Sequence, residues 1–277
     1  MRRSLAVLIF AAALAGCGGS DHERVNPETM LDQASQRRIS SANVEVEARL
    51  QVVGVERLSQ PLRLRVEGPY VSGGGERIPS FDWRLSASAL AFPIGGRLVS
   101  TGDDVYLSLY GDVYEVGNGA VEAANARIRE TAAATGSPLG LDPRSWFGRA
   151  RVEGEGSEGG ADCERIAAPL RRKAASRDLA PLAAELGLPV APTVSGTATA
   201  CVGYEDRLFH ELELSAVIGL PPADRARLGG ATGAVLDANV VIGDVGESER
   251  ISAPGGPYEP IRNLFLTLND LGVPVPY

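Results

Sequence analysis

The chain has 277 residues, of which 44% are hydrophobic and 22% charged, so it is long and apolar enough for a large core and is not a disordered protein. Asp and Glu outnumber Lys and Arg by 35 to 27, which argues against a nucleic-acid-binding protein, since such proteins usually present a basic face. Two histidines and three cysteines leave little material for a metal site with several ligands.

The first residues are typical of an export signal. Arg2 and Arg3 precede an apolar run over 5–14, which is shorter than the ~20 residues that a bilayer-spanning helix needs. The run ends in Leu14-Ala15-Gly16-Cys17, which resembles the bacterial lipobox, the motif whose cysteine thiol receives a diacylglycerol. We therefore expect residues 1–16 to be a lipoprotein signal peptide and Cys17 to be the lipidated residue, with acyl chains such as palmitate. A plain signal peptide with an incidental cysteine is the alternative.

Residues 17–25 are expected to form a flexible tether, and residues 26–277 a single domain. The stretch Gly18–Glu23 is polar, and His22 within it has no expected role. Removal of residues 1–16 takes away two arginines and lowers the net charge from −8 to −10. The chain is thus predicted to be held at the extracytoplasmic face of the bacterial cell membrane by its lipid, and not by attraction to anionic headgroups.

The folded domain is expected to begin with a helix and to continue as strands. Asn26-Pro27-Glu28 combines a capping residue, a proline at the first helical position and an acidic first turn, which predicts a helix over 27–39. Apolar residues then alternate with charged ones over 44–52, as in a half-buried strand. The same alternation predicts strands over 62–67, 81–89 and 105–109, with turns at 102–104 and 111–112. We expect an antiparallel meander with one apolar and one solvated face.

In the rest of the chain, helices and strands follow in blocks. We expect helices over 118–135 and 142–147, extended structure over 149–170, a helix from Asp178 to a stop at Gly187, strands over 194–202, 206–217, 234–242 and 248–253, and a helix over 261–271 ended by Gly272. No linker interrupts this order. The fold class that we predict is α+β, with a single curved antiparallel sheet whose apolar face is covered by helices.

Two cysteines remain once Cys17 carries lipid. Cys163 and Cys201 are an even pair in an exported chain and flank extended segments, so a structural disulfide is the first interpretation. It would stabilise the fold by roughly 4 kcal/mol in the chain-entropy model. Two free thiols or a redox pair are the alternatives, although no CxxC spacing supports redox chemistry.

His210 is the only histidine outside the tether. It falls on the apolar side of its segment, with Leu208, Leu212 and Leu214. It would be a polar contact in a ligand cavity, a pH-sensitive group, or a hydrogen-bonded core residue, and the last is the commonest role of such a histidine.

Searches for catalytic motifs find none. The sequence has no GxSxG nucleophile elbow, no HExxH and no Walker-type loop, and Gly73–Gly75 lies between strands as a turn. The acidic pairs Asp103-Asp104 and Glu205-Asp206 would bind calcium or act as paired carboxylates, but solvated turn residues are the simpler interpretation. We therefore predict a protein that is not an enzyme and needs no cofactor and no metal.

The order of these features resembles a known family. Three parts of the chain are similar to the LppX/LprG group of actinobacterial lipoproteins. They are the segment Asp103–Leu107 ahead of Asp112–Val116, the segment Asp142–Phe147 leading to Gly154, and the turn at 203–206 before Arg207–Leu214. That group is similar in fold to the lipoprotein carriers LolA and LolB. The resemblance covers most of residues 26–271. The Cys163/Cys201 pair and the glycine-rich stretch 154–160 depart from it.

The resemblance implies a half-barrel sheet wrapped over helices and an apolar cavity that accepts acyl chains. It implies a carrier of lipid, glycolipid or a lipidated molecule in the cell envelope, anchored to the membrane by its own lipid. Rival hypotheses are a cell-surface scaffold with a filled core, and an accessory subunit that presents a substrate to an envelope enzyme or exporter. The residues expected to line the cavity are Val46, Ala48, Leu50, Leu64, Trp83, Leu85, Ala87, Leu107, His210 and Leu212.

Overall fold

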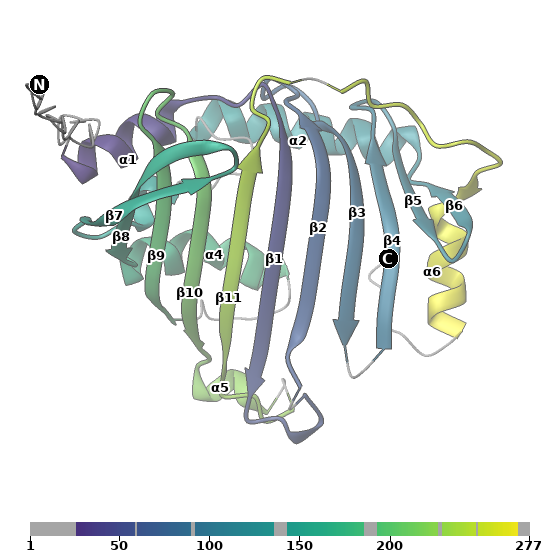
Figure 1. Cartoon of the computed structure of the whole chain (residues 1–277). Coiled ribbons are helices and arrows are strands. Elements are labelled where there is room, and N and C mark those ends of the chain that lie inside the picture. Colours follow the sequence, from purple (N-terminus) through teal and green to yellow (C-terminus); the bar gives the residue numbers. More distant parts are fainter. Residues whose placement is uncertain are drawn as a thin grey trace, which may run out of the picture.

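The computed structural model describes most of the chain (Figure 1). The described residues are 26–58, 60–89, 92–135, 143–185, 193–226, 229–247 and 249–270. The predicted signal peptide, the predicted lipidation site Cys17 and the predicted tether lie outside these ranges, as does the predicted helix stop at Gly187.

Within the described residues, twelve strands form one sheet in the order β12-β6-β5-β4-β3-β2-β1-β11-β10-β9-β8-β7. All neighbours are antiparallel except β12, which runs parallel to β6. The strands are β1 Ser41–Val53, β2 Leu62–Val71, β3 Ser80–Ala89, β4 Phe92–Ser100, β5 Val105–Leu109, β6 Asp112–Glu115, β7 Arg151–Glu158, β8 Ala161–Pro169, β9 Thr193–Gly203, β10 Phe209–Gly219, β11 Gly233–Gly243 and β12 Glu259–Pro260.

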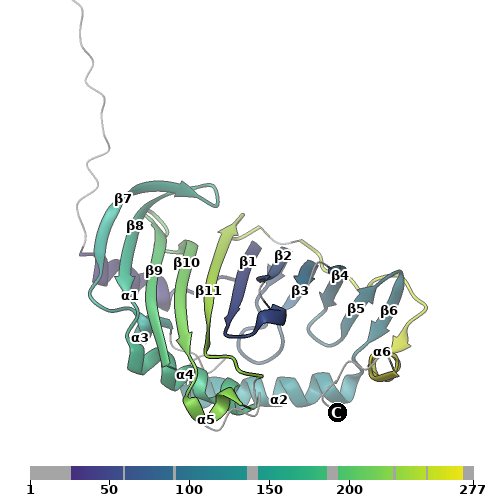
Figure 2. The same ribbon diagram turned by 90° about the horizontal axis from the view of Figure 1, so that it is seen from below.

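The helices lie on one side of the sheet. Figure 2 shows α2, α4, α5 and α6 along this side, and the sheet bending over them with its two edge strands apart. The predicted fold class, a curved half-barrel sheet over helices, is therefore confirmed. The helical segments are α1 Pro27–Gln36, the single turn η1 Glu56–Leu58, α2 Asn118–Thr135, α3 Pro143–Trp146, α4 Arg172–Glu185, α5 Pro222–Arg225 and α6 Ile261–Asp270.

The alternating pattern of the sequence accounts for the register at the centre of the sheet. β1 pairs with β2 on one side and with β11 on the other, so Val46 lies between Val66 and Val240, and Glu47 between Arg65 and Asn239. Apolar residues thus meet apolar residues on one face, and polar residues meet polar ones on the other.

The start of α1 is as predicted. The Asn26 side chain accepts a hydrogen bond from the Glu28 backbone N–H at 2.8 Å, and Pro27 follows the cap. The helix ends at Gln36 and not at 39, because Arg37 already has an extended backbone. Its buried residues, Met30, Leu31 and Ala34, pack into the main core cluster.

Several boundaries differ from the prediction. The strand predicted over 248–253 is wrong, since 249–258 forms no strand and leads instead to β12. Strand β4 was not predicted, because Pro93, Gly95 and Gly96 interrupt its apolar pattern, yet it pairs with β3 from end to end. The short strand β6 was not predicted either. Helix α4 begins at Arg172 and not at Asp178.

The segment before β12 lies against the sheet at β5. The ring of Tyr258 contacts the ring of Tyr106, with centroids 4.8 Å apart. Burial raises the pKa of Tyr106, and the negative charges of Asp104 and Glu115 add to this rise.

Cys163 of β8 and Cys201 of β9 form a disulfide, as predicted. The two strands are neighbours, the Cα atoms are 5.4 Å apart, and both residues are buried. The bridge joins the ends of a chain segment that contains all of α4.

Candidate functional site

The apolar face of the sheet, defined as its helix side, contains one row of residues that crosses eight strands. Side chains at directly paired positions lie on the same face, so the row can be followed through the register. It consists of Ile94, Ala87, Leu64, Ala48, Ala238, Leu214, Ala198 and Ala168, from β4 to β8.

Burial along this row is uneven. At its β8–β9 end, Ala168 and Ala198 are 2% and 3% exposed, because α1 and α3 pack there with Phe147. At the other end, Leu64 and Ile94 are each 43% exposed. One half of the apolar face is thus a filled core, whereas the half on β1–β4 leaves large apolar side chains accessible.

Helix α2 lies behind this accessible half and is attached at the ends of the strands. Figure 2 shows α2 running under the sheet. Asn125 accepts a hydrogen bond from the Ile78 N–H at 2.7 Å, and Arg129 donates to the Glu76 carbonyl at 3.2 Å. These polar contacts attach α2 to the β2–β3 loop. The attachment does not depend on α2 side chains that pack against the apolar face of the sheet.

Most residues predicted to line a cavity lie on the accessible half. Leu64 is exposed, and the others there are half-buried. They are Val46, Ala48 and Leu50 of β1, Leu64 of β2, Trp83, Leu85 and Ala87 of β3, and Leu107 of β5. Leu212 of β10 instead packs against the filled core cluster.

Trp83 carries an unused hydrogen-bond donor on this face. Its ring stacks on Phe81 with centroids 4.0 Å apart, and its buried Nε1–H has no hydrogen-bond partner among the described residues. A buried donor without a partner is unfavourable, so a carbonyl oxygen of a bound molecule would be stabilised there.

His210 does not line the apolar face, which corrects the cavity assignment. A β-bulge between Phe209 and Glu211 changes the alternation, and Phe209 packs against the core cluster in place of His210. The buried imidazole has Nε2 2.8 Å from an Asp206 carboxylate oxygen and Nδ1 3.3 Å from the Ile242 carbonyl. His210 is therefore a hydrogen-bonded buried residue, the commonest of the three roles considered.

Gly159 and Gly203 make room for this imidazole. A Cβ at Gly203 would clash with the Asp206 carboxylate and lie 3.0 Å from Nε2, and one at Gly159 would clash with the Ile242 carbonyl oxygen and lie 3.3 Å from Nδ1. Gly159 belongs to the glycine-rich stretch that departs from the family resemblance, so this stretch has a packing role. Asp206 is not a free turn residue either, because it also accepts a hydrogen bond from the Leu208 N–H.

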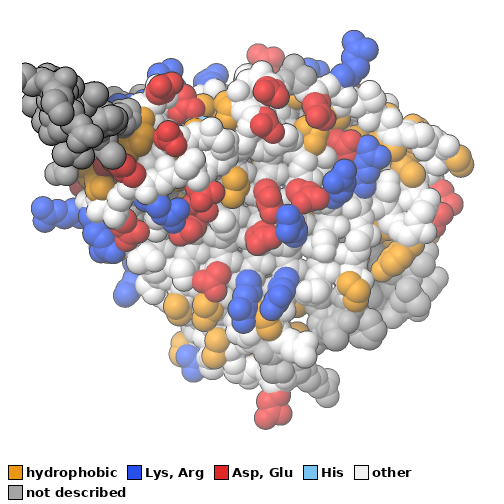
Figure 3. Space-filling view, viewed as in Figure 1, with side chains coloured by type: hydrophobic (Ala, Val, Ile, Leu, Met, Phe, Trp, Pro, Cys, Tyr) orange, Lys and Arg blue, Asp and Glu red, His pale blue; other side chains and the backbone are white. Residues whose placement is uncertain are grey.

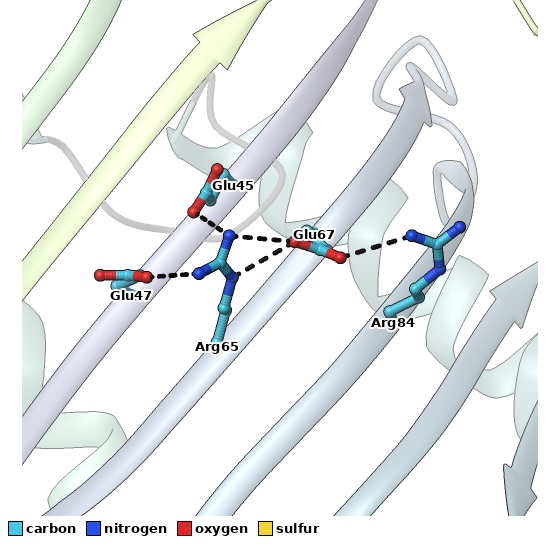
Figure 4. Close-up of polar contacts among 5 residues, drawn as sticks. All are labelled: Glu45, Glu47, Arg65, Glu67 and Arg84. Atoms are coloured by element: carbon cyan, nitrogen blue, oxygen red, sulfur yellow. Dashed lines mark hydrogen bonds and ion pairs between the residues drawn. The ribbon is translucent and has the colours of Figure 1, made fainter.

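The opposite face of the sheet, the polar face, carries ion pairs. Figure 4 shows Arg65 between three carboxylates, with Glu45 at 2.7 Å, Glu47 at 3.0 Å and Glu67 at 3.2 Å, and Arg84 on the far side of Glu67. All these groups are substantially exposed, so each pair adds little stability. The two arginines and three glutamates leave this cluster with one net negative charge.

Arg165 of β8 forms a second group on the polar face. It contacts Glu211 at 2.8 Å and Glu213 at 3.0 Å, and the Glu211 carboxylate is buried. The hydrogen bond to Glu213 raises the pKa of Arg165. Asn239 donates to Glu211 at 3.1 Å, which completes the partners of that carboxylate in the described structure.

In the described part of the chain, no three His, Cys, Asp or Glu side chains gather as metal ligands. Among the same residues, no helix has the length and hydropathy of a membrane span. Asp103, of the acidic pair considered for calcium, lies 3.6 Å from Arg77 in an exposed ion pair.

These features define an α+β protein with an open, curved antiparallel sheet, helices on one face, and an apolar face that is only half filled. Solved structures to which this chain is similar include LprF of Mycobacterium bovis, lipoprotein LppX of Mycobacterium tuberculosis and a LolA superfamily protein of Nitrosomonas europaea. LprF is 12% identical with a TM-score of 0.48, over 83% of this chain and 97% of its own. LppX is 13% identical with a TM-score of 0.43, over 82% of this chain and 98% of its own. The LolA superfamily protein is 11% identical with a TM-score of 0.24, over 84% of this chain and 96% of its own. No protein-family model and no curated protein matches the sequence.

Proposed function

We propose that the protein is a lipid-anchored, non-enzymatic carrier that binds the acyl chains of a lipid, glycolipid or lipidated molecule on the accessible half of its apolar face. The observation that carries the proposal is the exposure of Leu64 and Ile94, 43% each, on the helix side of the sheet. Leaving such side chains accessible is unfavourable in the free protein. An acyl chain laid across them would gain roughly 0.8 kcal/mol for each methylene that it buries.

The small side chains on this half support the same function. Ala48 and Ala87 flank Leu64 in the row, and Ala238 follows Ala48. These residues leave more volume above the sheet than Leu or Ile would, which suits a flexible chain better than a rigid ring. The Nε1–H of Trp83 would donate to an ester or amide carbonyl near the head of such a ligand.

Bound lipid is testable by native mass spectrometry. The full chain, purified from a bacterial membrane in a mild non-ionic detergent, is expected to carry a non-covalent lipid mass that denaturation removes. The mass of the covalent anchor, in contrast, survives denaturation and serves as the internal reference. Repeated absence of a removable mass, also after incubation with phospholipid and glycolipid, would favour the rival scaffold with a filled core.

The anchor is tested separately at Cys17. In wild-type cells the protein is expected in the membrane pellet. Its intact mass should exceed the mass of residues 17–277 by the mass of one lipid modification. Cys17→Ser should lose the modification, because serine lacks the thiol that accepts the diacylglycerol. Ser20→Ala in the predicted tether is the matched control and should behave as wild type. A Cys17→Ser chain that is cleaved like wild type would indicate a plain signal peptide.

A further inference from the structure

The polar face carries a groove of about 710 Å³ across the middle of the sheet. Figure 3 views this face, with Lys or Arg side chains in blue and Asp or Glu side chains in red over the central strands. The groove runs along two neighbouring rows of the register. Its lining also includes Ala48, Leu64, Leu214 and Ala238, which lie between these rows along their strands. One row is Ser88, Arg63, Arg49, Asp237, Ser215 and Thr197, and the other is Ser86, Arg65, Glu47, Asn239, Glu213 and Thr199.

The two rows differ in how their charges are compensated. In the second row, Arg65 and Glu47 pair with each other, and Glu213 pairs with Arg165. In the first row, Arg49 and Arg63 are directly paired positions on β1 and β2, so two arginine side chains leave the same face of neighbouring strands. Like charges at such positions are destabilising. Neither arginine has an ion pair or a side-chain hydrogen bond with any described residue.

The carboxylate nearest to this pair in the register keeps its negative charge but forms no ion pair with either arginine among the described residues. Asp237 faces Arg49 across β1 and β11, but it accepts a hydrogen bond from the Ser215 hydroxyl at 2.9 Å. Ser88 faces Arg63 on the other side and offers a hydroxyl. Farther along the groove, the Asn239 Oδ1 is buried and has no hydrogen-bond partner in the described part of the chain, which leaves an acceptor for a ligand hydroxyl.

We propose that this groove binds a phosphate group, held between Arg49 and Arg63. Two guanidinium forks present several N–H donors in planes that match phosphate oxygens, and a phosphate has enough oxygens to accept from both. The net charge of the chain is −8, so general attraction does not draw anions to it, and binding would depend on these two residues. The phosphate would belong to a soluble compound or to a lipid headgroup. The site uses the face opposite to the acyl-binding face, so it is independent of the proposed carrier function.

Titration calorimetry on the full chain in non-ionic detergent tests the site. Inorganic phosphate and dihexanoyl phosphatidic acid represent the two sources. Wild type is expected to bind at least one of them, more weakly as salt rises. The double substitution Arg49→Gln with Arg63→Gln should weaken binding by about tenfold or more. Arg84→Gln, which removes a cation from the same face outside the groove, should leave it unchanged.

Each outcome decides the proposal. If wild type binds inorganic phosphate and the double substitution weakens that binding, the proposal is supported and the phosphate comes from a soluble compound. If only phosphatidic acid binds and the double substitution weakens its binding, the proposal is supported and the phosphate comes from a lipid headgroup. No binding by wild type, or binding that the double substitution leaves intact, would overturn it. The urea midpoint of the double variant should equal or exceed that of wild type, because a repulsive pair is removed. Loss of phosphate binding in a fully folded variant is therefore attributable to the site, and apolar-face substitutions should leave it unaffected.

Discussion

Replacing Ala48 and Ala87 with phenylalanine is expected to remove bound lipid from the protein while leaving it folded. Both alanines lie on the accessible half of the apolar face, on either side of Leu64. Two phenyl rings there would occupy the space in which an acyl chain lies. We expect the non-covalent lipid mass in native spectra to fall below about a tenth of the wild-type level, and the free energy of unfolding to change by less than about 1 kcal/mol.

Ala198→Phe is the matched control for this experiment. Ala198 belongs to the same row but lies in the filled core, with 3% exposure. A phenyl ring there overpacks the cluster and should cost about 1–3 kcal/mol in urea unfolding. If Ala48→Phe were as costly as Ala198→Phe, the β1–β4 half would be packed as tightly as the core. The filled-core scaffold would then be the better hypothesis.

Removing the disulfide is expected to have the largest effect on stability. The bridge closes a segment with a sequence separation of 38, for which the chain-entropy model gives about 4 kcal/mol. The double variant Cys163→Ala with Cys201→Ala should lose about this amount in urea unfolding. Since small folded domains have only about 5–15 kcal/mol in total, the variant should be close to its unfolding threshold at physiological temperature.

Reduction distinguishes the bridge from the packing of the two side chains. Dithiothreitol should destabilise wild type by about the same amount as the double substitution, and should not affect the double variant. A decrease in the free energy of unfolding of less than about 1 kcal/mol would contradict a stabilising role of the bridge. If the double variant is destabilised but reduced wild type is not, the effect belongs to the packing of the buried cysteine side chains.

The strand content of the sheet followed from alternation, and the exceptions have local physical causes. β1 and β3 alternate strictly and were predicted closely. β4 was missed because two glycines and a proline interrupt its alternating pattern, although its partner β3 supplies the ladder. The bulge beside His210 was missed because the polar Glu211 is compatible with either face. The start of α4 depends on tertiary packing with α3 and β9, and helix propensities in the sequence carry no information about that packing.

The candidate site was predictable only in part. The alternation indicated which residues share the apolar face, but it could not indicate which half of that face α1, α3 and α4 would cover. Similarly, no sequence motif marks Arg49 and Arg63 as a binding site. They became neighbours only through the antiparallel register of β1 and β2, and the groove was completed by β11, which comes from the far end of the chain.

The position of β1 between β2 and β11 has a consequence for how the chain acquires its structure. β1 is made near the start of synthesis and β11 near the end, so the central ladder forms only after almost the whole chain is present. Until then β1 has one unpaired edge, with alternating apolar residues that favour association with other strands. High contact order of this kind slows folding. The protein should therefore depend on delayed folding, and a chain truncated before β11 should aggregate instead of forming a stable half-sheet.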